Sequence, residues 1–449
     1  MFPPPRRPSG LSALLLGALF SLPSFAWAAL DPHGLLLAWQ RDPTTTMTVD
    51  WHVDPSDQDV RVAWRPVAGE GEWSIVTGSR ETLPDSDRVV HRVELTGLAP
   101  DTQYLFKVGG YGRERRFRTM PAENISRPER IAMGGDVRAN EDSRRLTRQA
   151  VRFDPDFVLW GGDLAYANGD ERNIDRWHEF LDVVMREMVT PDGRTVPVVM
   201  GIGNHEVRGG YYDRNDHELR KELAPYTQDD ASRLRIAPYY YRLSAFPGQP
   251  GYGALDFGDY LSVLLLDTDH SNPIAGEQTR WLRKALADRV GRVAHVLPVY
   301  HVGAYPSARH WDGDVHRRVR EHWSPLFDRH RIPMVFEQHD HTYKRTWPIR
   351  EGRIDPRGVV YMGDGAWGVG VRGIGRNHEG EKAWYLDRVA SQSHAIMLTL
   401  QGNYQGLVVV NEQGRIIDEY PRTSLRDDLL PEAERWSIPA PAPAQTHAQ

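Results

Sequence analysis

Polar side chains able to bind metal ions stand at the ends of five apolar runs in the sequence. Each run has the length and composition of a buried strand, and the residues that follow these runs are Asp136, Asp163, Asn204, His301 and His339. Because the carboxyl ends of strands meet at one crevice of an α/β sheet, we expect these side chains to converge on a single site.

Two more donors, Tyr166 and His341, lie close to this series in the sequence. His339 and His341 are two residues apart, so on an extended segment both project to the same side and can address neighbouring cations. The seven oxygen and nitrogen donors are too many for one tetrahedral zinc but suit two cations that share a carboxylate, for which Asp163 is our choice. Asn204 adds a ligand without negative charge, which suits an anionic substrate.

Several of these residues also have an ordinary structural interpretation. Asn204 could cap a helix, Tyr166 could be a packed loop tyrosine, and His301 could be a buried core histidine. The succession of five strand ends, each with a donor, favours the metal site over these alternatives.

The surrounding pattern predicts two domains that differ in fold class. Residues 33–120 contain short alternating strands without a helical period, which indicates an all-β sandwich. A proline-bracketed linker covers 121–128. Over 129–425, apolar runs alternate with amphipathic segments, so we expect an α/β domain of packed sheets flanked by helices. The expected helices cover 141–153, 174–189 and 276–290.

Both ends of the chain read as segments outside the fold. In residues 1–28, two arginines precede an apolar run and the small-residue triplet Ala26-Trp27-Ala28, which predicts a signal peptide cleaved after Ala28. An uncleaved anchor is the alternative, and no membrane span is expected after cleavage. Arginine far outnumbers lysine, as in GC-rich bacterial genomes. In a bacterium, an exported protein is periplasmic or secreted, and we expect this location. The proline- and alanine-rich residues 426–449 predict a disordered tail.

Composition excludes several classes of function. The chain has 449 residues, 40% of them hydrophobic, and its net charge of -6 offers no global basic patch for nucleic acid or anionic membrane. Cysteine is absent, which excludes disulfides, thiol nucleophiles and cysteine-ligated metals. A dimer would therefore rest on non-covalent contacts, and the sequence leaves the oligomeric state open.

The motifs resemble those of a known family. The sequences G-G-D-V, G-G-D-L-A-Y, G-N-H-E, V-Y-H-V and H-D-H-T-Y-K-R resemble the five blocks of calcineurin-like metallophosphoesterases, and more narrowly those of purple acid phosphatases. The first block, at Asp136, lacks a histidine that most of the superfamily carries, and Tyr166 takes its place. The sandwich domain, with its stretch L-T-G-L-A-P-D-T-Q-Y-L-F-K-V, resembles a fibronectin type III module and fits the two-domain plan of that family.

The resemblance implies a ligand set and a reaction. It puts Fe(III) on Asp136, Asp163, Tyr166 and His341, and a divalent Fe, Zn or Mn on Asp163, Asn204, His301 and His339. It implies hydrolysis of phosphate monoesters by attack of a metal-bound hydroxide, with a small phosphoester as substrate. His205, next to a ligand, would bind the phosphate or protonate the leaving oxygen.

Three positions depart from the family pattern. Relatives often carry two adjacent histidines after the isolated histidine ligand, but here His310 is followed by Trp311, so the general acid stays open between His205 and His310. Arg138 replaces a small residue and could bind a phosphate oxygen or form a salt bridge. Gln338 replaces a glycine before His339 and could shift that loop without removing a ligand. The expected substrate-binding residues are thus Arg138, His205 and His310.

Two alternative functions remain on the sequence. The same metal pair could serve a phosphodiesterase acting on nucleotides or phospholipid headgroups. A secreted binding protein with a degenerate enzyme domain would be expected to lack ligands, and none is missing. The G-x-G-x-x-G match at 368–373 has no helix or acidic partner after it, so we interpret it as a loop near the mouth of the site.

Overall fold

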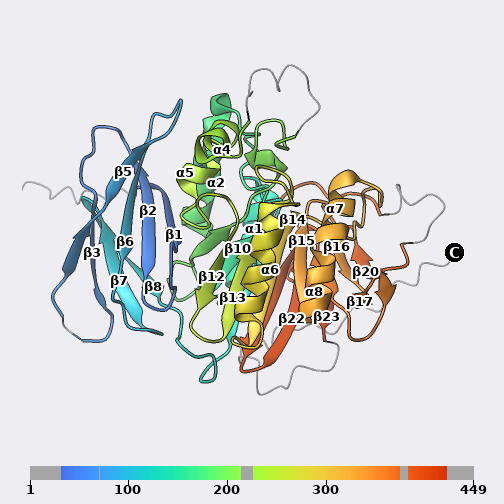
Figure 1. The fold of residues 1–449 in the computed structure, drawn as a ribbon. Coiled ribbons are helices and arrows are strands. Elements are labelled where there is room, and N and C mark those ends of the chain that lie inside the picture. Colours follow the sequence, from blue (N-terminus) through green and yellow to red (C-terminus); the bar gives the residue numbers. More distant parts are fainter. Residues whose placement is uncertain (1–31, 70, 214–225, 375–382, 422–449) are drawn as a thin grey trace, which may run out of the picture.

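The computed structural model describes residues 32–69, 71–213, 226–374 and 383–421 (Figure 1). The expected signal peptide (1–28) and tail (426–449) lie outside these residues. Along the chain, a β-sandwich comes first and an α/β domain follows it, as the sequence predicts. No helix in the described parts of the chain is both long and apolar enough to cross a bilayer.

The sandwich consists of two four-stranded antiparallel sheets, in the orders β1-β2-β6-β5 and β4-β3-β7-β8. Its strands are β1 (His33–Ala38), β2 (Met47–Val53), β3 (Arg61–Pro66), β4 (Ser74–Thr77), β5 (Ser79–Thr82), β6 (Val89–Leu95), β7 (Gln103–Val108) and β8 (Tyr111–Arg118). Strand β7 shows the cause of the layering, because Tyr104, Phe106 and Val108 are buried while the alternate side chains are partly exposed. The predicted sandwich is confirmed, whereas its likeness to fibronectin type III stays a prediction.

Two larger sheets form the α/β domain. The six-stranded sheet has the order β11-β10-β9-β21-β22-β23, and the seven-stranded sheet has the order β12-β13-β14-β15-β19-β16-β20. The first contains β9 (Glu129–Gly134), β10 (Phe157–Trp160), β11 (Val198–Met200), β21 (His394–Gln401), β22 (Tyr404–Asn411) and β23 (Ile416–Tyr420). The second contains β12 (Gly253–Phe257), β13 (Leu261–Leu265), β14 (His295–Val302), β15 (Met334–Gln338), β16 (Tyr343–Thr346), β19 (Val360–Gly363) and β20 (Leu386–Ala390). A hairpin of β17 (Ile349–Arg350) and β18 (Arg353–Ile354) lies apart.

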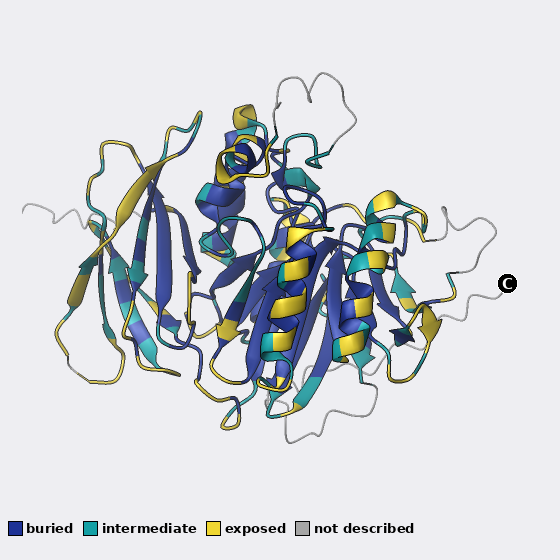
Figure 2. Ribbon diagram, in the orientation of Figure 1, coloured by how far each residue is buried: buried dark blue, intermediate teal, exposed yellow. Residues whose placement is uncertain are grey.

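Helices cover the outer faces of both sheets. Helices α1 (Glu141–Val151) and α2 (Ile174–Glu187) pack on the six-stranded sheet, while α6 (Glu277–Arg289), α7 (Asp314–His322) and α8 (Ser324–His330) pack on the other. The predicted helices at 141–153, 174–189 and 276–290 are thus present as α1, α2 and α6. Figure 2 shows α6 and α8 with exposed outer faces over buried strands. This pattern is that of amphipathic helices on a sheet.

A continuous apolar core links the two domains. It runs from the inside of the sandwich into the space between the two large sheets, where Leu159 of β10 and Phe336 of β15 are fully buried. Trp39, just after β1, packs edge-on against Phe157 and Phe257, with ring centroids 5.6 Å apart in each pair. The sandwich is therefore held firmly beside strand β10.

Candidate metal centre

Parallel strands bring the predicted residues to one edge of the two sheets. Strands β9 and β10 run parallel, as do β14 and β15, so the loops at their carboxyl ends meet. The loops after β9 and β10 continue as neighbours, because Asp136 N donates to Gly162 O at 3.0 Å and Val137 N donates to Asp163 O at 2.8 Å. His339 N donates to Asp136 Oδ2 at 3.0 Å and thereby joins the two sheets across the site.

Asp163, His301 and His339 form the buried centre of the cluster. One donor atom from each of the three residues lies within 4.8 Å of the others. His301 Nε2 lies 3.2 Å from Asp163 Oδ2 and 3.1 Å from His339 Nδ1. The sequence places His301 after an apolar run, whereas the structure has it inside β14, where a register irregularity between Val299 and Val302 re-aims the chain.

Asp136, Tyr166 and His341 form a second group beside the first. Asp136 Oδ1 accepts from the Tyr166 hydroxyl at 3.3 Å and lies 3.0 Å from His341 Nε2. Asp136 is fully buried, whereas Tyr166 and His341 are partly exposed. The resemblance assigns these two groups to two different metal positions, and that assignment stays a prediction.

Asn204 supplies the clearest sign that the site fits a cation. Gly203, not Asn204, is the N-cap of the short 3-10 helix η2 (Asn204–Glu206). Asn204 Oδ1 is buried, and among the described residues it has no hydrogen-bond partner. Leaving a buried carbonyl oxygen unpaired is unfavourable, and a cation would satisfy it. The remaining donors are carboxylate, imidazole and phenol groups, a set suited to transition metals.

His205 lies against the cluster. Its backbone N donates to Asp163 Oδ1 at 2.8 Å, and its ring lies on that of Tyr166 with centroids 4.1 Å apart. Nε2 stands 3.9 Å from Asp163 Oδ2, while Nδ1 bonds to Asn168 Oδ1. Burial lowers the pKa of His205. The ring is one-third exposed and can meet a substrate.

The other expected substrate residues stand differently. His310 is itself exposed, although most of the loop between it and β14 is buried, and no interaction among the described residues joins its side chain to the cluster. The neighbouring Trp311 stacks on Tyr385 and carries Arg320 over its ring at 3.7 Å. Arg138 is exposed and forms no ion pair within the described chain, so the salt-bridge interpretation is not seen.

Gln338 fits the loop without displacing a ligand. Its side chain lies over two glycines, since a Cβ added to Gly135 or Gly161 would stand only 2.9 or 2.8 Å from Gln338 Cγ. Gly161 O in turn accepts from His301 Nδ1 at 3.2 Å. The Gln338 side chain thus occupies the space left by the missing side chains of Gly135 and Gly161.

The charges of the site are arranged for cations. Burial favours the neutral form of Asp163, but the adjoining His301 imidazole outweighs it and lowers the carboxyl pKa. The opposite holds for His301: burial lowers its pKa, yet Asp163 raises it to about 9. In the described chain, Asp136 and Asp163 have only imidazoles as ion-pair partners. Positive charge is favoured there, and no arginine or lysine of the described residues forms an ion pair with either carboxylate.

Sequence reasoning missed three residues that hold the ligand loops. Glu206 accepts from the backbone N of Asp163, Leu164 and Gly203 at 2.7, 2.8 and 2.8 Å. Asp340 Oδ2 accepts from the backbone N of Ser307, Ala308 and Arg309 at 2.7, 2.7 and 3.2 Å. His270 lies edge-on to His301, with centroids 5.4 Å apart, and its Nδ1 donates to Gly210 O. The acidic residues inside G-N-H-E and H-D-H were the available signals.

The backbone at the site is unusual for residues that carry side chains. Five of the predicted ligands have left-handed φ angles: Asp136 (55°), Asp163 (54°), Tyr166 (59°), His339 (86°) and His341 (58°). The surrounding backbone approaches closely, because a Cβ on Gly365 would lie 2.0 Å from Asp136 Oδ2 and one on Gly203 would lie 2.3 Å from Asp163 Oδ1. The ligand loops are therefore fixed by tight backbone packing.

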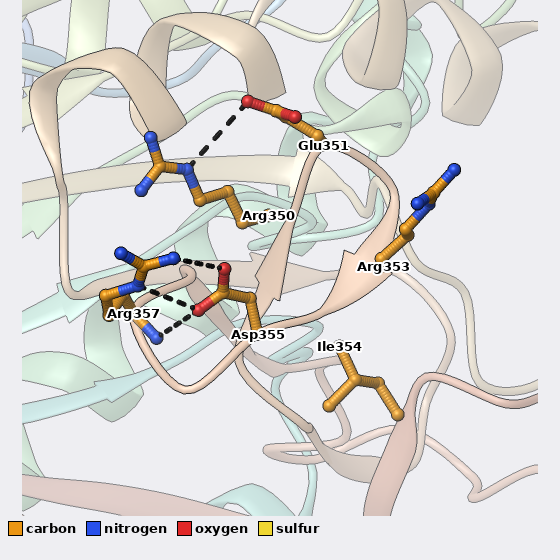
Figure 3. Close-up of a pocket in the computed structure, with 6 residues that line it drawn as sticks. All are labelled: Arg350, Glu351, Arg353, Ile354, Asp355 and Arg357. Atoms are coloured by element: carbon orange, nitrogen blue, oxygen red, sulfur yellow. Dashed lines mark hydrogen bonds and ion pairs between the residues drawn. The ribbon is translucent and has the colours of Figure 1, made fainter.

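An open hollow of about 540 Å³ lies elsewhere, at the β17–β18 hairpin, and contains none of the predicted site residues (Figure 3). Arg357 pairs there with Asp355 at 3.2 Å, and Arg350 lies 4.0 Å from Glu351. Acidic neighbours thus offset two of its arginines.

Two family models match the chain in the order of its domains. The model described as "Purple acid Phosphatase, N-terminal domain" matches residues 32–119, and the model described as "Calcineurin-like phosphoesterase" matches residues 130–343. Their limits agree with the sandwich and with the part of the α/β domain that carries all seven predicted ligands.

Similar proteins carry related names. Purple acid phosphatase 21 of Arabidopsis thaliana is 28% identical over 283 residues, which cover 62% of this chain and 58% of that protein. Acid phosphatase type 7 of Mus musculus is 25% identical over 433 residues, which cover 87% of this chain and 90% of that protein. The chain spans less than two thirds of the length of the first curated relatives, 58% and 62%.

A solved structure shares the fold. The purple acid phosphatase PPD1 from yellow lupin (Lupinus luteus) seeds superposes with a TM-score of 0.69 at 19% identity, covering 86% of this chain and 73% of that one. The two family models, matched in sequence order, together with this two-domain fold, show that the chain belongs to the purple acid phosphatase family of calcineurin-like phosphoesterases.

Proposed function

We propose that the protein hydrolyses phosphate monoesters at a centre of two metal ions. The observation that carries the proposal is the buried trio of Asp163, His301 and His339, whose donor atoms lie within 4.8 Å of one another. The adjoining group of Asp136, Tyr166 and His341 and the unpaired oxygen of Asn204 supply the rest of a two-cation ligand set.

The seven ligands divide between two positions that share Asp163. Asp136, Tyr166 and His341 would hold Fe(III), because phenolate and carboxylate oxygens suit a hard trivalent ion. Asn204, His301 and His339 would hold a divalent Fe, Zn or Mn. When bound, the two cations would lower the pKa of a coordinated water and draw charge from the phosphoryl oxygens.

His205 would handle the proton at the leaving oxygen. Nδ1 bonds to Asn168 Oδ1, so with the amide oriented in this way Nδ1 carries a hydrogen. Nε2 then donates only when the ring is doubly protonated, a state that a nearby phosphate dianion favours. In that state His205 can bind the phosphate or protonate the leaving oxygen. His205 contacts the cluster directly, whereas no interaction among the described residues joins the His310 side chain to it.

Metal analysis with a visible spectrum tests the centre directly. We expect about two metals per chain after reconstitution, and fewer than about one would contradict the proposal. If iron is bound by Tyr166, Tyr166→Phe should lose a phenolate-to-iron charge-transfer band. A band that persists in the variant would contradict that ligand assignment.

The substrate class is tested with an aryl phosphate monoester and the matching bis-aryl diester. We expect the monoester to have the higher kcat/KM. A preference for the diester would instead identify a phosphodiesterase, and a metal-loaded protein that binds a partner but hydrolyses neither ester would favour the binding-protein alternative.

Export is part of the proposal and rests on residues 1–28. Expression of the full chain in a bacterial host should yield periplasmic or extracellular protein whose N-terminus is Ala29. Intact-mass measurement would detect this cleavage, and a membrane-retained uncleaved chain would identify an anchor.

A further inference from the structure

Two arginines from different loops flank the segment that carries His339 and His341. Arg309 follows β14, and its Nε lies 3.2 Å from Oδ1 of Asp340, the residue between the two histidines. Arg372 belongs to the glycine-rich loop 368–373, and its backbone N donates to His341 O at 3.0 Å. In the same loop, Gly370 O accepts from His341 Nδ1 at 3.3 Å. Both arginines are thus anchored beside the candidate metal centre.

Arg372 has no carboxylate partner among the described residues. Its side chain is half-buried, and no carboxylate in the described chain lies within ion-pair distance of it. Burial lowers the pKa of Arg372, and the positive charge of Arg309 lowers it further, while Asp340, and after it Asp136 and Tyr166, act in the opposite direction. Arg309 contacts Asp340 and Arg372 contacts the neighbouring His341, so both residues bring positive charge to the same short segment.

Asp340 cannot compensate both arginines. Its Oδ2 already accepts three backbone N–H groups, and its other oxygen lies beside Arg309. Among the described residues, the buried Arg345 shows the contrasting case, because it contacts both Asp387 and Asp418. A half-buried guanidinium without a carboxylate partner would be stabilised by a bound anion.

Charge balance indicates which anion this is. In the proposed function the scissile phosphate, a dianion, already meets two cations and His205. Two further guanidinium groups exceed what that group requires. Arginine is suited to bidentate contacts with phosphate oxygens.

We propose that Arg309 and Arg372 form a second anion site beside the metal centre, which binds a second phosphate group on the leaving part of the substrate. This inference rests on the proposed function and narrows its substrates to molecules with two phosphate groups. Arg372 is the better probe, because Arg309 also contacts Asp340 between two predicted ligands.

The test compares propane-1,3-diol monophosphate with propane-1,3-diol bisphosphate, using the metal-loaded full-length protein. These substrates have the same alkyl leaving oxygen and differ in the second phosphate. We expect the wild-type protein to favour the bisphosphate in kcat/KM by about 10- to 100-fold, as charged hydrogen bonds to one phosphate allow. In Arg372→Gln the ratio should fall toward one, mainly through a higher KM for the bisphosphate.

Two further variants make the result specific. Arg309→Gln should reduce the same ratio, with metal content measured to show that the ligands remain loaded. Arg283→Gln, which removes an arginine from the exposed face of α6, should leave both substrates unchanged. Arg372→Lys should restore part of the preference, since it keeps the charge but loses the bidentate geometry.

The outcomes separate this inference from the proposed function. Equal kcat/KM for the two substrates in the wild type, or an equal loss for both in Arg372→Gln, would overturn the second anion site while leaving the phosphatase intact. If neither substrate nor an aryl phosphate is hydrolysed, the proposed function fails and the second site fails with it.

Discussion

Strand β10 has a buried aspartate just beyond each of its ends, and the two carboxylates have opposite surroundings. Asp156, before the strand, accepts from Arg118 at 2.6 Å, from Arg127 at 3.0 Å and from the backbone N of Arg130 at 2.9 Å. Asp163, after the strand, has His301 at 3.2 Å and the backbone N of His205 at 2.8 Å. Burial opposes ionisation of both groups, but the arginines lower the pKa of Asp156 and His301 lowers that of Asp163.

The difference lies in what neutralises each carboxylate. A guanidinium is permanently charged, so Asp156 and Arg118 of β8 form a fixed link between the sandwich and the α/β domain. An imidazole can lose its proton and bind a metal. A cation could therefore replace the His301 proton as the positive charge beside Asp163. The two aspartates thus differ in their partners: arginines give Asp156 a structural role, and histidine leaves Asp163 able to bind a metal.

Removing the charge at the chemical end should have the largest effect. Asp163→Asn eliminates the carboxylate that, in the proposed function, both metal positions share, so phosphatase kcat should fall by at least about 10³-fold. His301→Ala should behave similarly. Steady-state kinetics with an aryl phosphate, metal analysis and circular dichroism check this, and a folded Asp163→Asn variant with near wild-type turnover would contradict the proposed site.

The same substitution at the structural end should act on stability instead. Asp156→Asn leaves Arg118 and Arg127 without their buried partner, so the free energy of unfolding should fall by about 3–5 kcal/mol. Turnover per folded molecule should be unchanged. Urea denaturation measures the stability of Asp156→Asn, and a kinetic assay measures its turnover. A loss of kcat without a loss of stability would contradict the structural role of Asp156.

Glu206 should show an intermediate effect at the chemical end. Glu206→Gln places an amide NH₂ where the carboxylate accepts three backbone N–H groups, so two donors would face each other and the ligand loops would shift. We expect metal affinity or kcat/KM to fall by about 10- to 100-fold. Glu171→Gln, at an exposed position, is the matched control; equal behaviour of the two variants would remove Glu206 from the supporting set.

The smallest expected effect is a pH dependence near Asp156. Glu129 is fully buried at the start of β9, and burial, aided by the charge of Asp156, raises its carboxyl pKa to about 8. Because the folded state then holds a proton more tightly than the unfolded chain, this contribution to stability is complete below the ordinary glutamate pKa and is lost as pH rises toward about 8.

Glu129→Gln removes that titration. Relative to the wild type, the variant should gain unfolding free energy progressively between about pH 5 and pH 8. Urea denaturation at several pH values measures the gain. A pH-independent difference between the two proteins would show that Glu129 does not titrate in this range.

The strand ends could be predicted because their signals are local. An apolar run followed by Asp136 or Asp163 marks a strand and its loop within a few residues, and the period of 141–153 marks helix α1. The grouping of donors followed from the general rule that such ends meet.

Other parts of the site depend on contacts that no local pattern contains. Glu206 binds backbone groups 42 and 43 residues earlier, and Asp340 binds those 31 to 33 residues earlier. The place of Arg372 beside His341 follows from the folding of a loop with no periodicity. For His310, the family pattern predicts a role, and nothing in the sequence indicates that the neighbouring Trp311 packs on Tyr385.

The left-handed backbone of Asp136, Asp163, Tyr166, His339 and His341 implies that the coordination geometry is preorganised. Each such residue raises the energy of the folded chain by about 1–2 kcal/mol relative to glycine, a cost met by packing elsewhere. The loops that would hold the cations therefore need no ordering when the ions arrive. Chelation should therefore remove the ions without unfolding the ligand loops, and the ions should bind again without a change in loop conformation.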